Sequence, residues 1–355
     1  MLFSRENKQN KNIMKQYKLS ICIPARSEEF LKNTVEDILK NKEAETEIIV
    51  GLDGKWSDPP LIQHPDVNII YVPEAIGQRA MVKLCAKLST AKYIAKCDAH
   101  CSFDEGFDRK MLESFEKTGD NVALVPIMRN LHAFSWKCMK CGNKWYQGPT
   151  PTECKETNYK NTNKPCDSKK FKKKLMWIGK HNPQSTSYCF DKEPHFQYFE
   201  DWKHRPQYIK DKAEKGITET MSLQGSFYMM TREKYFALDI DDENLGSWGN
   251  QGLTVASKVW LSGGKVLVIH STWYSHLFRT QGGDFSFPYE QRGRDVQRTK
   301  ANVRKQIWLG KLIKQKYPLS WLVEKFAPVP GWSAEDIVGL KEQEKKNAPL
   351  LESVK

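Results

Sequence analysis

The stretch KLSICIPARSEEFLKNTVEDILKNKEAETEIIVGLDG, residues 18–54, has the pattern of a strand, a helix and a second strand. The apolar run at 18–24 ends at Pro24, and the run at 47–54 ends at Asp53-Gly54. Between them apolar residues recur at helical spacing, and Ser27 is placed to cap the first turn. A connection of this length can join parallel neighbours, so the stretch predicts the start of an α/β sheet.

The same alternation continues to residue 128. We expect further strands at 67–72, 93–103 and 121–128, and a helix through 81–90 after the Gly77-Gln78-Arg79 turn. Strands separated by crossover helices predict a mostly parallel sheet with helices on both faces. Ligands of such sheets bind beyond the carboxyl ends of the strands, where Asp53, Asp98 and His100 stand. This half of the chain therefore has the pattern of a nucleotide-binding unit.

Asp98-Ala99-His100 carries the first candidate metal ligands. On an extended strand end, side chains two residues apart point the same way. A carboxylate and an imidazole suit a divalent ion that also holds phosphate oxygens. Such an ion neutralises the charge that a diphosphate leaving group acquires. By itself, a motif this short is a weak signal.

Five segments, in the same order, resemble the family-2-type glycosyltransferases, and among them most the polypeptide N-acetylgalactosaminyltransferases. The segments are AKCDAHCSF (95–103), GSFYMMTREKYFAL (225–238), DENLGSWGNQGLTVASKVWLSGGKVLVI (242–269), HLFRTQGGDFSFP (276–288) and RTKANVRKQIWLGKLIKQKYP (298–318). The resemblance implies a GT-A-like nucleotide-binding sheet with helices on both faces. It also implies a UDP-sugar donor and a catalytic Mn²⁺ (or Mg²⁺).

Carried over residue by residue, the resemblance identifies the manganese ligands as Asp98, His100 and His276. It places Asp53 near the nucleoside base, and Arg79 and Arg279 near the diphosphate. The other residues it assigns to the donor site are Pro24, Gly77 and Gly225. Structural roles stay open: Asp53 could cap a βα turn, His276 could be a core histidine, and Arg279 could form a surface ion pair.

The tryptophan-glycine region departs from the family pattern. Where the family has tryptophan-glycine-glycine-glutamate-asparagine, this chain has Trp248-Gly249-Asn250-Gln251-Gly252. The region is catalytic in the family, so we expect Trp248 and Gln251 at the reaction centre. An amide cannot take a proton as a carboxylate does, so Gln251 cannot act as a general base. We therefore expect a retaining transfer, with Asp242 or Glu243 as the base if the reaction inverts.

Residues 130–190 are rich in Lys, Asn, Thr, Pro and Cys with little periodicity, and we expect an insertion outside the sheet. Four thiols in it could complete a tetrahedral structural zinc site: Cys138, Cys141, Cys154 and Cys166. The CxxC pair resembles one knuckle of a zinc ribbon, but a second CxxC is absent. Two disulfides or unrelated thiols are the alternatives. A segment with few aliphatic residues needs a staple, which favours metal.

Positive charge is concentrated in the same insertion. The chain has a net charge of +13, and residues 129–180 hold 13 Lys and Arg against three acids. A second basic run at 292–316 has nine Lys and Arg and one Asp. Lysines interleaved with aromatics are typical of nucleic-acid binding, for which the candidates are Lys172, Lys173, Lys174, Trp145 and Tyr146. The alternatives are a solvated lysine-rich surface and a small core made by the aromatics themselves.

The organisation we expect has five parts. They are a basic N-terminal tail (1–17), a nucleotide-sugar-binding half (18–129), the insertion (130–190), an acceptor half (191–289) and a basic helical C-terminal segment (290–355). The sequence contains no run of about 18 apolar residues that could span a membrane. The N-terminus lacks the apolar core of a signal peptide, so we expect a cytoplasmic protein.

The function that these features predict is a metal-dependent transferase moving a hexose or N-acetylhexosamine from a UDP-sugar to a hydroxyl. The favoured acceptor is a polyanion, namely DNA. The sugar would be added to a hydroxymethylated base, as in virus-type (phage) DNA modification. Protein hydroxyls or surface polysaccharide form the second hypothesis. A third is a catalytically inactive zinc-ribbon protein that binds nucleic acid.

Overall fold

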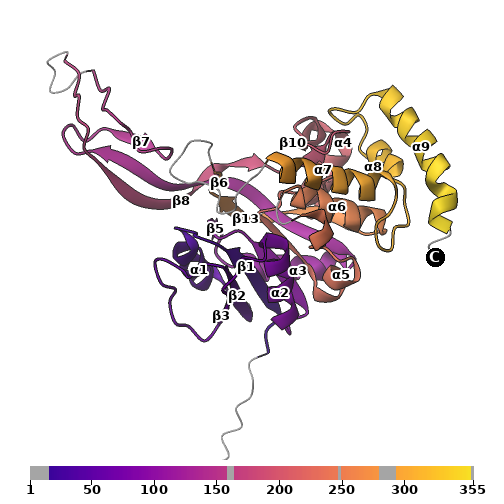
Figure 1. Ribbon diagram of the computed structural model, residues 1–355, viewed down its shortest axis with the longest axis horizontal. Helices are drawn as coiled ribbons and strands as arrows, with labels where there is room; N and C mark the ends of the chain where they lie inside the picture. The colour runs from indigo at the N-terminus through magenta and orange to yellow at the C-terminus, as the bar shows by residue number, and fades with distance from the viewer. Residues whose placement is uncertain (1–15, 158–163, 247–248, 280–292, 353–355) are drawn as a thin grey trace, which may run out of the picture.

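One curved sheet runs through the whole molecule (Figure 1). The computed structural model describes residues 16–157, 164–246, 249–279 and 293–352. The main path of the sheet has the order β11-β13-β6-β12-β4-β1-β2-β3, and β5, β7 and β8 pair at its side.

The N-terminal half is a parallel α/β unit, as the sequence predicts. Its strands β1 (Leu19–Ala25), β2 (Thr46–Asp53), β3 (Val67–Val72) and β4 (Tyr93–Cys97) are joined in parallel. Its helices are α1 (Leu31–Asn41), α2 (Gln78–Leu88) and α3 (Phe107–Thr118). Ser27 does not cap α1, which begins at Leu31 and has no side-chain cap.

Helices cover both faces of the sheet, which confirms that expectation. On β1, Cys22 packs into a core with Met81 and Cys85 of α2. Its neighbour Ile21 packs into a second core with Val35 of α1 and Met111 of α3. Every residue of β1 and β2 is buried, because both faces of these strands contact helices.

The second half of the sheet is mixed rather than parallel. Its strands are β5 (Cys101–Phe103), β6 (Val122–Cys138), β11 (Ile217–Glu219), β12 (Phe227–Thr231) and β13 (Lys265–His276). β12 lies antiparallel between β4 and β6, whereas β13 runs parallel to β6. The expectation of a mostly parallel sheet is therefore wrong beyond β4. Between β6 and β12 the chain passes through several further strands and helices, and not through a single crossover helix.

The remaining elements pack around the C-terminal half. They are β9 (Tyr188–Phe190), β10 (Phe196–Tyr198), η2 (Asp201–His204), α4 (Pro206–Lys215), α5 (Arg232–Ala237), η3 (Glu243–Leu245), α6 (Gln251–Leu261), α7 (Gly293–Trp308), α8 (Leu319–Lys325) and α9 (Ala334–Glu352). α6 is buried along its whole length within the first core. Across the described ranges, no helix has the length and apolarity needed to span a membrane.

The expected insertion is continuous with the sheet. β6 runs on to Cys138 and pairs with β7 (Lys144–Tyr146) and β8 (Phe171–Ser185), so the three strands form a ribbon that projects from the body (Figure 1). The expectation that 130–190 lies outside the sheet is therefore wrong. Phe134 and Trp136 of β6 pack with Phe30 and Leu277 of the body, which fixes the base of the ribbon.

Candidate active site

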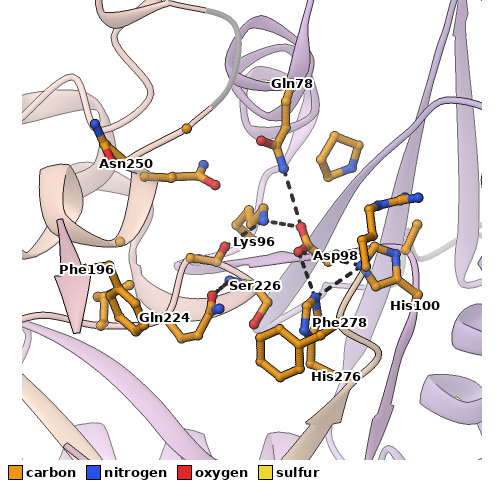
Figure 2. Close-up of a pocket in the computed structure, with 18 of the residues that line it drawn as sticks. Gln78, Lys96, Asp98, His100, Phe196, Gln224, Ser226, Asn250, His276 and Phe278 are labelled. Atoms are coloured by element: carbon orange, nitrogen blue, oxygen red, sulfur yellow. Dashed lines mark hydrogen bonds and ion pairs between the residues drawn. The ribbon is translucent and has the colours of Figure 1, made fainter. Parts of the chain in front are cut away.

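Asp98, His100 and His276 converge at the carboxyl end of β4. β4 ends at Cys97 and β5 begins at Cys101, so both residues of the Asp-x-His motif lie in the turn between two strands and not on one strand over 93–103. His276 ends β13 directly opposite Cys101. The His276 Nε2 lies 3.2 Å from Asp98 Oδ2 and 3.1 Å from His100 Nε2 (Figure 2). One ligand atom from each residue lies within 4.8 Å of the others.

These three groups fit a divalent metal ion. His100 Nδ1 lies 3.2 Å from Glu28 Oε2, and because a carboxylate accepts, Nδ1 is the donor and Nε2 faces the other two groups. Burial lowers the pKa of His276 to about 4, so this imidazole is neutral at pH 7. Ligands at 2.0–2.1 Å from one ion stand about 3 Å apart when adjacent, as the imidazoles do here.

Glu28 and Arg279 form the support behind His100. The second oxygen of Glu28 accepts a hydrogen bond from Arg279, and both side chains are largely buried. The chain thus has a carboxylate–histidine arrangement of the kind that orients metal ligands. Glu28 was not predicted from the sequence, although it follows the end of β1 just as Asp53 ends β2.

Lys96 is a second residue that the sequence analysis missed. Its ammonium, on a buried strand, contacts Asp98 Oδ1 and donates to the Gly225 carbonyl at 2.6 Å (Figure 2). Burial acts to raise the pKa of Asp98, but the Lys96 charge and the His276 hydrogen bond outweigh it and hold the pKa well below its usual range. A lysine in an otherwise apolar strand was the available signal.

A cavity of about 480 Å³ opens over this cluster. Of the predicted site residues, it is lined by Pro24, Asp98, His100, Gly225, Gln251, His276 and Arg279. Among the described residues, its lysines and arginines are Arg26, Lys96, Arg279 and Lys300, and its acids are Glu28 and Asp98. Phe196 and Phe278 supply flat apolar surface. A cavity of this size and charge suits a nucleotide diphosphate.

Three residues predicted for the donor site lie outside the cavity lining. The Asp53 carboxylate accepts hydrogen bonds from the Ile76 and Gly77 amides, at 2.7 and 3.0 Å. Gly77 has φ +95° at the start of α2, which is why glycine is needed there. Arg79 is buried, with Nη2 donating to the Gly249 carbonyl at 2.5 Å. Asp53 thus caps the βα turn, and its contact with the nucleoside stays a prediction.

Of the residues predicted to lie on the acceptor side, one lines the cavity and two do not. Gln251 lines the cavity and donates to buried Asp241 at 2.6 Å. Asp242 caps η3 through the Asn244 amide, and Glu243 is mostly exposed beside Lys83. Neither acid lines the cavity, so neither is placed to act as a base. Trp248 lies outside the described residues.

The four thiols predicted to bind zinc gather at the tip of the ribbon. Cys138 Sγ lies 3.7 Å from Cys166 Sγ, and Cys141 Sγ lies 3.5 Å from Cys154 Sγ. These separations are far too long for disulfides and close to the roughly 3.8 Å edge of a tetrahedron with 2.3 Å zinc–sulfur bonds. The backbone amides of Lys140 and Asn143 donate to Cys138 Sγ and Cys141 Sγ, an arrangement that favours thiolates.

The residues predicted to bind nucleic acid do not share one surface. Lys173 pairs with Glu29 at 2.5 Å and lies over the Phe134 ring. Trp145 packs against Phe171 beside the thiol cluster, so it belongs to the small core of the ribbon. Lys172, Lys174 and Tyr146 are exposed. Strand alternation separates Lys173 from its neighbours, which the sequence analysis had grouped together.

Comparison with known proteins agrees with this geometry. Residues 20–177 match the model of the family described as Glycosyl transferase family 2. The chain is 28% identical over 113 residues to polypeptide N-acetylgalactosaminyltransferase 5 of Mus musculus, covering 30% of the chain and 12% of that protein. It is 23% identical over 203 residues to the putative polypeptide N-acetylgalactosaminyltransferase 13 of Drosophila melanogaster, covering 57% and 28%. The chain thus spans less than a third of the length of these curated relatives.

A solved structure shows the fold. The crystal structure of GalNAc-T7 with UDP, GalNAc and Mn²⁺ superposes with a TM-score of 0.57 at 14% identity, covering 94% of this chain and 55% of that one. The predicted GT-A-like fold is confirmed. So is the resemblance, because residues 20–177 match the family-2 glycosyltransferase model and the relatives named above are polypeptide N-acetylgalactosaminyltransferases.

Proposed function

We propose that the protein is a metal-dependent glycosyltransferase that takes a hexose or an N-acetylhexosamine from a UDP-sugar. The observation that carries the proposal is the convergence of Asp98, His100 and His276 at the floor of a basic cavity. The bound UDP and Mn²⁺ of the GalNAc-T7 structure support the same donor and the same metal. Asp98 and the two imidazoles would hold the ion, which supplies positive charge to the leaving diphosphate.

The basic side chains of the cavity act on the same leaving group. Lys96 and Arg279 lie beside the metal ligands, and Arg26 and Lys300 lie on the cavity wall. Together they offset the negative charge that develops when the sugar–phosphate bond breaks. Glu28 keeps His100 in the tautomer that presents Nε2 to the cavity.

Transfer proceeds with retention of configuration. Within the described part of the cavity wall, Glu28 is engaged by His100 and Arg279, and Asp98 by Lys96 and His276, so neither is placed to deprotonate an acceptor. The bond from the sugar C1 to the β-phosphate breaks, the bond from C1 to the acceptor oxygen forms on the same face, and the acceptor proton passes to the departing phosphate. The product of an α-linked donor should therefore show α anomeric coupling by NMR. A β linkage would require a base and would contradict this course.

The four ribbon thiols form a structural zinc site in this proposal. The ribbon tip has few apolar residues to hold its loops, and a tetrahedral ion would tie residues 138–166 together. A reducing compartment such as the cytoplasm would keep these thiols available as ligands.

The acceptor we favour is a hydroxymethylated base in DNA, a chemistry suited to a virus that glycosylates its genome. The exposed lysines of the ribbon support a polyanionic acceptor. Hydroxyls of proteins or surface polysaccharide form the alternative, and a catalytically inactive binding protein is the third.

One set of assays separates these functions. UDP-sugars are incubated with hydroxymethylated duplex DNA, serine- and threonine-containing peptides, and glycans, with Mn²⁺ or with a chelator, and the product mass is recorded. A hexose or N-acetylhexosamine added to DNA only when Mn²⁺ is present supports the proposal. Addition of the sugar to peptide or glycan alone would support the second hypothesis, in which the acceptor is protein or surface polysaccharide. Absence of both donor hydrolysis and transfer with every UDP-sugar would refute the enzyme.

A further inference from the structure

Three lysines face one another across the ribbon without an acidic partner. Lys144 of β7 pairs with Lys137 of β6, which in turn pairs with Lys172 of β8. Neighbouring strands lie about 4.8 Å apart, so the three side chains leave the sheet within roughly 10 Å. Like charges directly opposite one another destabilise a sheet. All three are exposed, and within the described ranges none contacts a carboxylate. An external anion would relieve this repulsion.

The same face carries further cations and an aromatic ring. Ser135 lies two residues from Lys137 on the same face of β6. It pairs with Lys174 of β8 on one side and with Tyr146 of β7 on the other. Lys180 lies over the Tyr146 ring at 4.2 Å, and 44% of that tyrosine is exposed. From Lys172 to Lys180 the strand advances roughly 26 Å, the length of about eight base pairs of duplex. We name this surface the basic face: Lys137, Lys144, Tyr146, Lys172, Lys174 and Lys180.

The base of the opposite face packs against the body. Phe134 and Trp136 belong there to one core with Phe30, and Lys173 is paired with Glu29. Strand alternation therefore turns Lys173 toward the body and turns Lys172 and Lys174 the other way.

The basic face leads to the candidate active site. Asn130 of β6 pairs with His276 of β13, and two residues further along β6 His132 lies against Tyr146 at 4.2 Å between ring centroids. A linear chain of phosphates laid along the face would thus reach the neighbourhood of the metal ligands. A ribbon three strands wide matches such a chain better than it matches a flat anionic membrane.

We propose that the basic face binds the phosphodiester backbone of a nucleic acid and guides it toward the cavity. The chemistry done to that nucleic acid rests on the proposed transferase function, whereas the binding itself does not. Lysines contact the phosphates, and Tyr146 offers a ring on which an unpaired base can stack.

The test compares two triple variants that remove the same charge. One carries Lys137→Gln, Lys144→Gln and Lys172→Gln on the basic face. The other carries Lys210→Gln, Lys345→Gln and Lys346→Gln, exposed positions on α4 and on α9, which lies at the opposite end of the molecule (Figure 1). Affinity for a fluorescein-labelled 20-base-pair duplex and for the matching single strand is measured between 50 and 300 mM salt. Binding of UDP with Mn²⁺ is measured in parallel.

The basic-face variant should lose about 0.9 in the slope of log affinity against log salt for each phosphate contact removed, up to roughly 2.7 for duplex. The distal variant should keep the wild-type slope, and both should bind UDP normally. An unchanged slope in the basic-face variant would overturn the inference. So would wild-type protein that binds phosphatidylglycerol vesicles but neither form of nucleic acid. Wild-type protein that binds nucleic acid but does not bind UDP would refute the proposed transferase function. The inference that the basic face binds nucleic acid would still hold.

Discussion

The charge on Asp98 is shared among several neighbours. One oxygen contacts Lys96 and lies 3.4 Å from Gln78 Nε2, and the other accepts from His276. This leaves the second oxygen beside both imidazoles, where an ion would be held. Lys96 therefore does two things: it orients the carboxylate and it reduces the negative charge that the metal must balance.

Glu28 should control metal affinity through His100. The Glu28→Gln variant keeps the shape of the side chain but removes the charge that holds the proton on His100 Nδ1. Mn²⁺ affinity, followed by electron paramagnetic resonance in the presence of UDP, should fall 10- to 100-fold. Glu29→Gln is the matched control, because Glu29 pairs with Lys173 on the ribbon and does not touch the imidazoles. Equal Mn²⁺ affinity in the two variants would show that Glu28 has only a structural role.

Functional residues could be predicted from the sequence where they belong to a recognisable motif. The Asp-x-His motif and His276 were found in the sequence, and they do converge, but by a turn between β4 and β5 and not by strand alternation. Glu28 was missed because its partner His100 lies 72 residues away in the chain, and Lys96 was missed although it stands in an otherwise apolar strand two residues before Asp98. Asp53 and Arg79 were assigned to the donor, but here Asp53 accepts from amides of the βα turn, and Arg79 donates to the Gly249 carbonyl and lies 3.8 Å from Asp241.

At the scale of elements, β11, β13 and α4 meet around a histidine. His270 of β13 shares a hydrogen bond with Thr218 of β11 at 2.9 Å and lies beside Tyr208 of α4. Its Nδ1 is buried with no hydrogen-bond partner within the described residues. Burial, with a smaller contribution from Lys212, lowers the pKa of His270 to about 4.

This histidine should make folding sensitive to acid. In the unfolded chain its pKa is near 6.5, so between pH 6.5 and 4 the unfolded state binds a proton that the folded state does not. Stability contributed by the neutral side chain is therefore present above pH 6.5 and lost as pH falls through this window. His270→Gln should lose less stability than wild type between pH 7.5 and pH 5, by roughly 1–2 kcal/mol, as measured by urea unfolding. Identical losses in the two proteins would contradict this assignment.

The ribbon strands depend on the thiol cluster for their outer end. Cys141→Ser should release about one zinc ion per chain and raise hydrogen exchange in residues 138–171, while β1 to β4 keep their protection. Cys189→Ala is the control, because this thiol is buried in the first core, far in sequence from the cluster. Zinc content comes from elemental analysis. Purified wild-type protein without zinc, or release of zinc by the control variant, would rule out this site.

Elements were predictable where periodicity was strong. The strands and helices of residues 18–97 were expected because apolar alternation and helical spacing are local properties, whereas α3 was not predicted. The ribbon was missed because its strands carry lysines on one face and pair with partners some 40 residues away. Its aromatic residues alternate with those lysines, which looked like mixed composition in the sequence.

At the scale of the whole molecule, the cavity lies over the carboxyl ends of β1 and β4. The ribbon projects from the body of the sheet (Figure 1). The two large cores lie on the two faces of the sheet and contain no residue of the ribbon tip. The ribbon adds a third small core near its base and the thiol cluster at its tip. The body should therefore fold and bind donor without the outer ribbon.

Shortening the ribbon tests this division of labour. Lys137 and Lys172 are register partners, so joining them through Asn-Gly, which favours the tight hairpin turn, removes residues 138–171 with little strain on the remaining strands. The shortened protein keeps Phe134 and Trp136 at the base, and it should unfold cooperatively and bind UDP with Mn²⁺ at wild-type affinity. It lacks the zinc ligands, Lys144 and Tyr146, so its KM for a nucleic-acid acceptor should rise at least tenfold while donor hydrolysis in the absence of acceptor stays unchanged. Calorimetry, UDP titration and steady-state kinetics on the same preparation separate these effects. If the shortened protein no longer binds UDP, the ribbon contributes to the donor site itself, and the separation of a donor-binding body from an acceptor-binding ribbon is wrong.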